Sequence, residues 1–140
     1  MIVRDVQKSD LASVHRLIGQ LGYPTDPLEF QARFERVVAT LDHRIFVAEE
    51  DGRVVGVLHA FVRPALEKPC EVVVQALVVE ADRRSTGVGE ALMREAEAWA
   101  ADRGLSSTAL YTRIDRDRSR AFYERLGYRL KGTSNLMGRP

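Results

Sequence analysis

The chain has 140 residues, with 21 Lys and Arg against 20 Asp and Glu, so its formal net charge is +1. That length fits one compact domain, and a hydrophobic content of 45% argues against a disordered chain. The even charge argues against a protein held to nucleic acid by charge alone. A single cysteine, Cys70, excludes an intrachain disulfide and a cysteine-rich metal site.

The sequence also indicates where the protein works. The N-terminus becomes polar and charged within four residues and so lacks the apolar region of a signal peptide, and no apolar run approaches the roughly 20 residues of a membrane span. The three histidines show no metal-ligand spacing, so we expect no bound metal. We therefore expect one domain over residues 1–140 that is soluble and cytoplasmic, with no membrane partner.

The first part of the chain predicts a strand and two helices. Residues 2–6 alternate between apolar and polar side chains, as a short strand does. Helical spacing predicts a helix over residues 10–21, and an aspartate followed by proline predicts the start of a second helix over residues 26–40. The predicted apolar face of this second helix consists of Leu28, Ala32, Phe34, Val37, Val38 and Leu41.

Three strands follow. Residues 45–49 and 54–62 are strand-like, and Asp51-Gly52 between them is a strong hairpin signal. Residues 64–69 read as a loop. The run EVVVQALVV at residues 71–79 is almost entirely apolar or β-branched, which suits a strand covered on both faces.

The last part of the chain alternates helices and strands. A polar connection over residues 80–86 leads to a long helix over residues 87–103, and residues 107–112 predict a strand. A short helix is expected over residues 118–126, followed by one or two strands from Tyr128 onward. This order predicts an α/β fold in which a mixed sheet is flanked by about four helices.

A glycine-containing turn joins the buried strand to the long helix and carries the strongest chemical signal. Backbone N–H groups at a helix start are unpaired, and the helix dipole adds positive charge there. Gly87 and Gly89 would let a phosphate approach the backbone, and Arg83 and Arg84 add charge beside it. The alternative is that the two glycines only shape a tight turn. The Walker and dinucleotide-binding patterns do not match.

Two motifs resemble the GNAT family of N-acetyltransferases. Residues 84–89, RSTGVG, resemble the family's acyl-CoA pyrophosphate loop, Arg/Gln-x-x-Gly-x-Gly/Ala. Residues 116–128, RDRSRAFYERLGY, resemble its C-terminal helix signature, which ends Phe-Tyr-Glu-x-Leu-Gly-Tyr/Phe. The motifs stand in the family's order, separated by a helix and a strand. The resemblance implies a mixed sheet with a splayed pair of strands, and acetyl-CoA as co-substrate.

The resemblance also implies a site. Main-chain groups of Leu77 and Val79 would bind the pantetheine arm between the splayed strands, and a backbone N–H near Val78 would stabilise negative charge on the thioester oxygen. Tyr123 would protonate the leaving thiolate, or alternatively would only pack in the core beside Phe122. The other residues expected to contact the coenzyme are Arg84, Ser85, Thr86, Gly87, Val88, Gly89 and Glu90 at the pyrophosphate, and Arg116 and Ser119 at the pantetheine or 3′-phosphate.

The group that accepts the amine's proton is left open. Gln75 stands where many relatives carry glutamate, and an amide cannot take a proton at neutral pH, so our hypothesis is that Gln75 orients the acceptor. Strand alternation predicts that Glu71 shares a face with Gln75, Leu77 and Val79. Glu71, His59 and water therefore all remain candidates.

The implied reaction moves an acetyl group from acetyl-CoA to a primary amine of a small molecule or peptide, by direct attack in a ternary complex. The alternative is a sensor module that binds acyl-CoA without turnover. Residues 1–82 carry 9 basic and 13 acidic side chains, and residues 83–140 carry 12 and 7, so the acceptor side is expected to favour a cationic amine. A homodimer is left open by the resemblance, and no nucleic-acid partner is expected.

Overall fold

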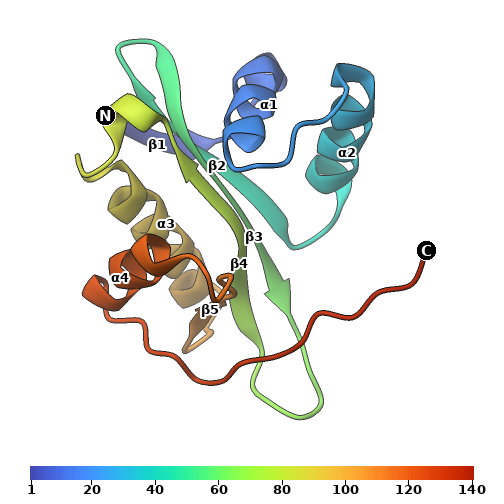
Figure 1. Ribbon diagram of the computed structural model, residues 1–140, viewed down its shortest axis with the longest axis vertical. Coiled ribbons are helices and arrows are strands. Elements are labelled where there is room, and N and C mark those ends of the chain that lie inside the picture. The colour runs from blue at the N-terminus through green and yellow to red at the C-terminus, as the bar shows by residue number, and fades with distance from the viewer.

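A five-stranded sheet with helices on both faces forms the protein in the computed structural model, which describes residues 1–140 (Figure 1). The strands are β1 (Ile2–Asp5), β2 (His43–Glu50), β3 (Arg53–Arg63), β4 (Glu71–Val79) and β5 (Thr108–Leu110). The helices are α1 (Leu11–Gln20), α2 (Pro27–Ala39), α3 (Val88–Asp102) and α4 (Asp117–Arg125), with short 3-10 turns η1 (Lys8–Asp10) and η2 (Ala81–Arg83). None of these helices combines the length and apolar character that crossing a membrane requires.

The sheet is mixed, as the sequence predicts. Its strand order follows the chain, β1-β2-β3-β4-β5, and every pair is antiparallel except β4 and β5, which are parallel. The predicted hairpin is confirmed, because β2 and β3 are joined through the turn at Asp51-Gly52. The parallel pair requires the crossover through α3, which lies on one face of the sheet.

Each face of the sheet carries its own core. α3 and α4 lie on one face and α1 and α2 on the other (Figure 1). Beneath α3, Leu92, Met93 and Trp99 pack against apolar side chains of β2 and β3, among them Phe46. Beneath α1 and α2, Leu17 and Phe34 pack in a second cluster. Two separate apolar layers hold the sheet fixed, so the edges of its strands are positioned by both.

A glycine sets how closely α3 approaches the sheet. A Cβ atom on Gly56 of β3 would lie 2.9 Å from both Leu92 Cδ1 and Val88 Cγ1. Val88 is the first residue of α3, so this contact fixes where the helix begins relative to β3 and β4.

Strand β4 changes character halfway along its length. On one side it pairs with β5 only over Val72–Val74, so from Gln75 onward that edge has no partner strand. On the other side a β-bulge interrupts the pairing with β3, where His59 faces Ala76 and the next residue, Ala60, faces Val74. Gln75 is the extra residue. The splayed strands that the family resemblance implies are therefore β4 and β5, which diverge from Gln75 onward.

The bulge overturns the expected face of Glu71. Before it, Val72 and Val74 face the α3 core, whereas after it Leu77 and Val79 do so. Inserting one residue reverses the alternation of side chains, so Glu71 does not share a face with Leu77 and Val79. Its carboxylate instead pairs with Arg63 and accepts a hydrogen bond from Ser107 Oγ at 3.0 Å.

Two further expectations about elements are wrong. No strand follows Tyr128, and residues 129–140 are exposed with no regular structure. Strand β5 is three residues long and offers only a short edge for pairing.

The predicted apolar face of α2 is wrong in part. On α2 the buried residues are Phe30 and Phe34, while three members of the predicted apolar face are exposed: Leu28, Val38 and Leu41. Leu28 lies in the first turn and Leu41 beyond the helix end, where the sheet does not cover them.

Candidate active site

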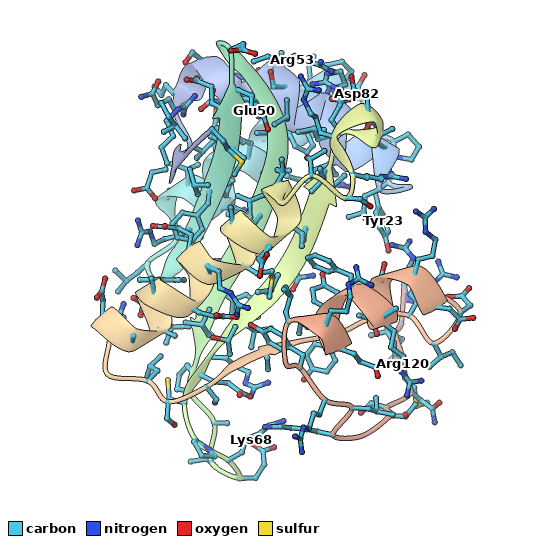
Figure 2. The ribbon with its side chains drawn as sticks, turned by 90° about the vertical axis from the view of Figure 1, so that its left-hand side faces the viewer. Tyr23, Glu50, Arg53, Lys68, Asp82 and Arg120 are labelled. Atoms are coloured by element: carbon cyan, nitrogen blue, oxygen red, sulfur yellow. The ribbon has the colours of Figure 1, made fainter.

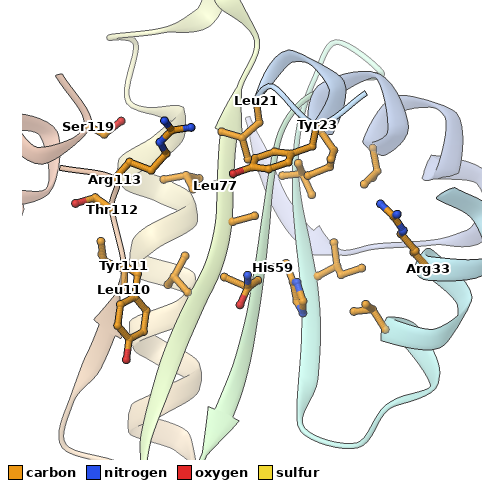
Figure 3. Close-up of a pocket in the computed structure, with 18 of the residues that line it drawn as sticks. Leu21, Tyr23, Arg33, His59, Leu77, Leu110, Tyr111, Thr112, Arg113 and Ser119 are labelled. Carbon is orange, nitrogen blue, oxygen red and sulfur yellow. The ribbon is translucent and has the colours of Figure 1, made fainter. Parts of the chain in front are cut away.

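A cleft of about 530 Å³ opens where β4 and β5 separate (Figure 3). Residues 74–77 of β4 line one side, and residues 110–113, which continue from β5, line the other. Side chains of α1 and α2 line one end, and α4 contributes Ser119 and Tyr123. The cleft therefore lies along the half of β4 that pairs with β3 on one side and has no partner strand on the other.

The open edge of β4 presents main-chain groups to the cleft. The N–H of Glu80 donates to the carbonyl oxygen of Val55 at 2.8 Å, so the N–H of Glu80 points toward β3. Main-chain groups of a strand alternate in direction, so the N–H of Val78 also points toward β3, and those of Leu77 and Val79 point away from it. This agrees with the direction expected for Leu77 and Val79, but it leaves Val78 turned away from the cleft.

Beyond β4, an exposed loop leads into the start of α3. Gly87 precedes the first helical residue with a φ of 94°, in the left-handed region, and no side chain caps the helix. The N–H groups of Val88, Gly89 and Glu90 therefore have no partner within the helix. A Cβ atom on Gly87 would meet nothing within 4 Å, so the backbone is accessible there. An uncapped helix start with open space beside it suits an anion.

The two loop arginines have different roles. Arg83 pairs with Glu50 at 3.3 Å and is partly buried. Arg84 is exposed and forms no ion pair, so its guanidinium is free to bind an anion at the helix start. Ser85 has a φ of 64° and Thr86 donates its hydroxyl to the carbonyl of Arg83, so the loop is held in a turn.

Gly89 serves packing rather than ligand access. A Cβ atom there would lie 3.1 Å from Cζ of Phe122 and 3.6 Å from Cγ2 of Val79. The small residue lets the aromatic side chain of α4 sit against the first turn of α3. The second glycine of the loop motif and the first aromatic residue of the α4 motif are therefore in contact.

Glu80 anchors the start of the loop, a role that the sequence did not reveal. Its side chain is buried and accepts a hydrogen bond from Gln20 of α1. It also forms an ion pair with Arg16 of the same helix, and Arg53 lies 3.3 Å away. Hydrogen bonds from Gln20 and Arg16 lower the pKa of Glu80. Figure 2 shows Glu50, Arg53 and Asp82 near one another at the same end of the sheet. Sequence reasoning missed this role because an acidic residue after an apolar strand is common and does not by itself indicate a buried ion pair.

Tyr123 lies between the α3 core and the cleft. Its ring contacts Phe122 and Tyr128 edge-on, at centroid distances of 5.0 and 6.1 Å, while the residue also lines the cleft. Its hydroxyl makes no hydrogen bond within the protein. Burial raises the pKa of Tyr123 to about 12, so the phenol keeps its proton at neutral pH. Core packing and exposure of the hydroxyl to the cleft are thus compatible.

A histidine pair lies on the opposite wall. Nε2 of His59 is 3.0 Å from Nδ1 of His43, so one ring donates to the other, and the His43 ring stacks on Phe61 at 5.0 Å. Burial, with a smaller contribution from the charge of His43, lowers the pKa of His59 to about 4. His59 lines the cleft and Glu71 does not, so of the two side chains considered as proton acceptors only the imidazole reaches it.

The remaining predicted residues gather at the cleft, together with residues that the sequence did not single out. Gln75, Arg116 and Ser119 all line it, and Nη2 of Arg116 donates to the carbonyl of Leu21 at 3.4 Å. Arg33 and Arg113 line it as well. No Asp or Glu does, so the expected negative acceptor side is wrong. The acidic residues of the first part of the chain lie elsewhere. Nowhere do three or more His, Cys, Asp or Glu side chains form a group that could hold a metal.

Solved structures share this fold. An aminoglycoside 6′-N-acetyltransferase from Acinetobacter haemolyticus superposes with a TM-score of 0.90 at 19% identity, over 100% of this chain and 99% of that one. A second aminoglycoside N-acetyltransferase, in complex with a CoA bisubstrate analogue, gives 0.89 at 20% identity, over 99% and 97%. A protein described as a transcriptional regulator from Bacillus halodurans gives 0.88 at 20%, over 99% of both chains. At these identities the likeness concerns the fold alone.

Sequence comparison identifies the family. No curated protein matches the chain significantly. The sequence model of the Acetyltransferase (GNAT) family, however, matches residues 11–128, which include both motifs and the whole cleft. The chain therefore belongs to the GNAT acetyltransferase family.

Proposed function

We propose that the protein transfers an acetyl group from acetyl-CoA to a primary amine by direct attack within the cleft. The observation that carries this proposal is the continuity of two features, the unpaired edge of β4 and the uncapped start of α3. Together they form one path of free main-chain groups from the cleft to the start of α3. That path matches the chemistry of a coenzyme with an amide-containing arm and a pyrophosphate.

The residues present fit such a coenzyme. Amides of Leu77 and Val79 would bind the pantetheine arm, and N–H groups in the loop and first turn, over residues 85–90, would bind the pyrophosphate with the side chain of Arg84. Arg116 and Ser119 would contact the arm or the 3′-phosphate from α4. The oxyanion donor in this proposal is an amide on the open edge, Leu77 or Val79, because the N–H of Val78 faces β3.

Bound acetyl-CoA supplies an acetyl group activated as a thioester. The amine nitrogen forms the new bond to the acetyl carbon while the carbon–sulfur bond breaks. Tyr123 donates its hydroxyl hydrogen toward the departing sulfur. Its pKa of about 12 favours a hydrogen bond over complete loss of the proton. An amide N–H of β4 stabilises the negative charge that develops on the carbonyl oxygen.

His59 accepts the proton that the amine nitrogen loses. The attacking nitrogen becomes positively charged as its bond forms, which makes its N–H strongly acidic. A neutral imidazole with a pKa near 4 is therefore a sufficient base, and burial keeps His59 neutral at physiological pH. Gln75, exposed at the bulge beside His59, orients the acceptor by hydrogen bonding.

Calorimetric titration of the full chain with acetyl-CoA, combined with a thiol-release assay, tests this function. Arg84→Glu is expected to weaken acetyl-CoA binding about 10- to 100-fold, because it replaces a charge-assisted hydrogen bond with repulsion. Lys68→Glu is the control, since it makes the same change of charge at a loop far from the cleft (Figure 2).

Wild-type protein that shows no acetyl-CoA binding would refute the proposal. Binding without thiol release toward any amine would indicate the sensor module instead. Equal losses in Arg84→Glu and Lys68→Glu would contradict the position of the pyrophosphate.

A further inference from the structure

We propose that the acceptor is a primary amine borne on an apolar body, aromatic or branched aliphatic, without a second positive charge. This inference rests on the proposed function, because it concerns the part of the same cleft that remains for the amine. It names a substrate class that family membership does not specify and that differs from the cationic amine expected from the charge distribution of the sequence.

The walls of the acceptor end are hydrocarbon. Val14 of α1, Phe30 and Phe34 of α2, and Val57 of β3 line the cleft, and each is less than one-tenth exposed. They belong to the packed core beneath α1 and α2, so the helices cannot turn polar side chains toward a ligand without disrupting that core. An apolar group placed here loses contact with water and gains packing contacts.

No carboxylate is available to a cationic ligand. Those on α2 and at its start do not line the cleft, and each already has a partner within the protein. Asp26 accepts hydrogen bonds from the backbone N–H groups of Leu28 and Glu29, and Glu29 pairs with Arg33 at 2.7 Å. Glu35 accepts from Gln31 at 3.1 Å. A second ammonium group would have no partner to replace its hydration.

The charges that do line the cleft are positive. Arg33, Arg113 and Arg116 all contribute to its walls, and Figure 3 shows Arg33 and Arg113 on opposite sides. Arg33 and Arg113 are paired with Glu29 and Asp115, but Arg116 has no carboxylate partner. The site therefore disfavours polyamines and aminoglycosides, which carry several ammonium groups, because no carboxylate lines the cleft to pair with the additional charges.

Initial rates of thiol release at saturating acetyl-CoA test the inference. The amines are 2-phenylethylamine, an alkylamine series from propylamine to hexylamine, spermidine and kanamycin. We expect kcat/KM for 2-phenylethylamine to exceed that for spermidine about 100-fold, because an additional ammonium group would lose hydration in the cleft without gaining a partner. Each added methylene is expected to raise kcat/KM about three- to fourfold while it is buried.

A pair of charge-reversal variants on one helix sharpens the test. Arg33→Glu places a carboxylate at the cleft wall, and we expect it to raise kcat/KM for spermidine relative to 2-phenylethylamine about tenfold. Arg36→Glu makes the same change at an exposed position of α2 that does not line the cleft, so the ratio should stay at the wild-type value.

The outcomes separate this inference from the proposed function. Spermidine or kanamycin acetylated as fast as 2-phenylethylamine would overturn the substrate class while leaving the acetyltransferase proposal intact. Acetyl-CoA binding without turnover of any apolar amine would also overturn it. If acetyl-CoA itself did not bind in the calorimeter, the proposed function would fail first, and this inference with it.

Discussion

The two ends of the cleft are built from different parts of the chain. The coenzyme end uses the main chain of β4, the loop after it and the first turn of α3, which are consecutive in the sequence. The acceptor end uses side chains of α1, α2 and β3, which come from separate segments. A site made of consecutive main-chain groups can be recognised in the sequence, as a pattern of glycines and an arginine. A site made of scattered apolar side chains resembles an ordinary core.

The comparison also explains the charges. Backbone N–H groups and Arg84 give the coenzyme end its positive character, which suits phosphate groups. No carboxylate lines the acceptor end, most of its walls are apolar, and Arg33 and Arg113 are already paired with Glu29 and Asp115. In the proposed function, selectivity for the coenzyme would depend on charge and hydrogen bonds, whereas selectivity for the acceptor would depend on apolar contact and on the lack of a carboxylate for a cation.

The largest expected effect lies at Tyr123, where the two ends meet. Tyr123→Phe removes the hydrogen that the hydroxyl donates to sulfur, so kcat should fall about 100-fold with little change in acetyl-CoA affinity. Tyr128→Phe is the control, because that hydroxyl donates to Glu97 at 2.6 Å and joins the segment after α4 to α3. It should reduce stability and leave kcat unchanged. Steady-state rates with calorimetry separate the two, and an unchanged kcat in Tyr123→Phe would contradict its role.

An effect of comparable size, on stability rather than on rate, is expected at the acceptor end, from His59. Its pKa is about 4 in the folded protein against an ordinary value of 6.5, so the unfolded chain binds the proton more readily. Stability is therefore fully present above pH 6.5 and declines as the pH falls from 6.5 toward 4, by about 3 kcal/mol. Urea unfolding at a series of pH values measures this slope. His59→Gln should flatten it, and an identical slope in that variant would show that another group is responsible.

The smallest effect concerns the glycine that positions the coenzyme end. Gly56→Ala forces Val88 and Leu92 away from β3 and should lower the free energy of unfolding by about 1–2 kcal/mol. Acetyl-CoA affinity should fall with it, while KM for the amine stays unchanged. Gly19→Ala, inside α1 with nothing within 4 Å of the new Cβ atom, should stabilise the protein by about 0.5–1 kcal/mol. Urea denaturation that gave both variants the same sign would contradict this packing argument.

Much of the fold could be predicted because the signals are local. Asp51-Gly52 predicted the hairpin, and the capping Asp26 with Pro27 correctly predicted the start of α2. The errors arose where partners decide the outcome. The segment after Tyr128 forms no strand beside the short β5, and Leu28 and Leu41 are exposed because the sheet does not extend over them.

The candidate site divides along the same line. The residues around Arg84 and Gly87 were predicted from their motif, and their place at the start of α3 follows from the strand-to-helix order. The face of Glu71 was predicted wrongly, since a bulge at Gln75 depends on how β3 pairs with β4. The contact of His59 with His43 depends on strand register as well, because a further irregularity in the β2–β3 pairing shifts which residues face each other.

By itself the sequence determined the family motifs, the order of the elements and the position of the loop for which we propose anion binding, because each depends on residues that are neighbours in the chain. The tertiary structure alone decided that the cleft is apolar and lacks carboxylates, that Gly89 packs against Phe122, and that the N–H of Val78 faces β3. The physical reason is that burial, charge pairing and the direction of a strand's main-chain groups are set by contacts between distant segments. A count of 21 basic and 20 acidic residues carries no information about which of them face the same cavity.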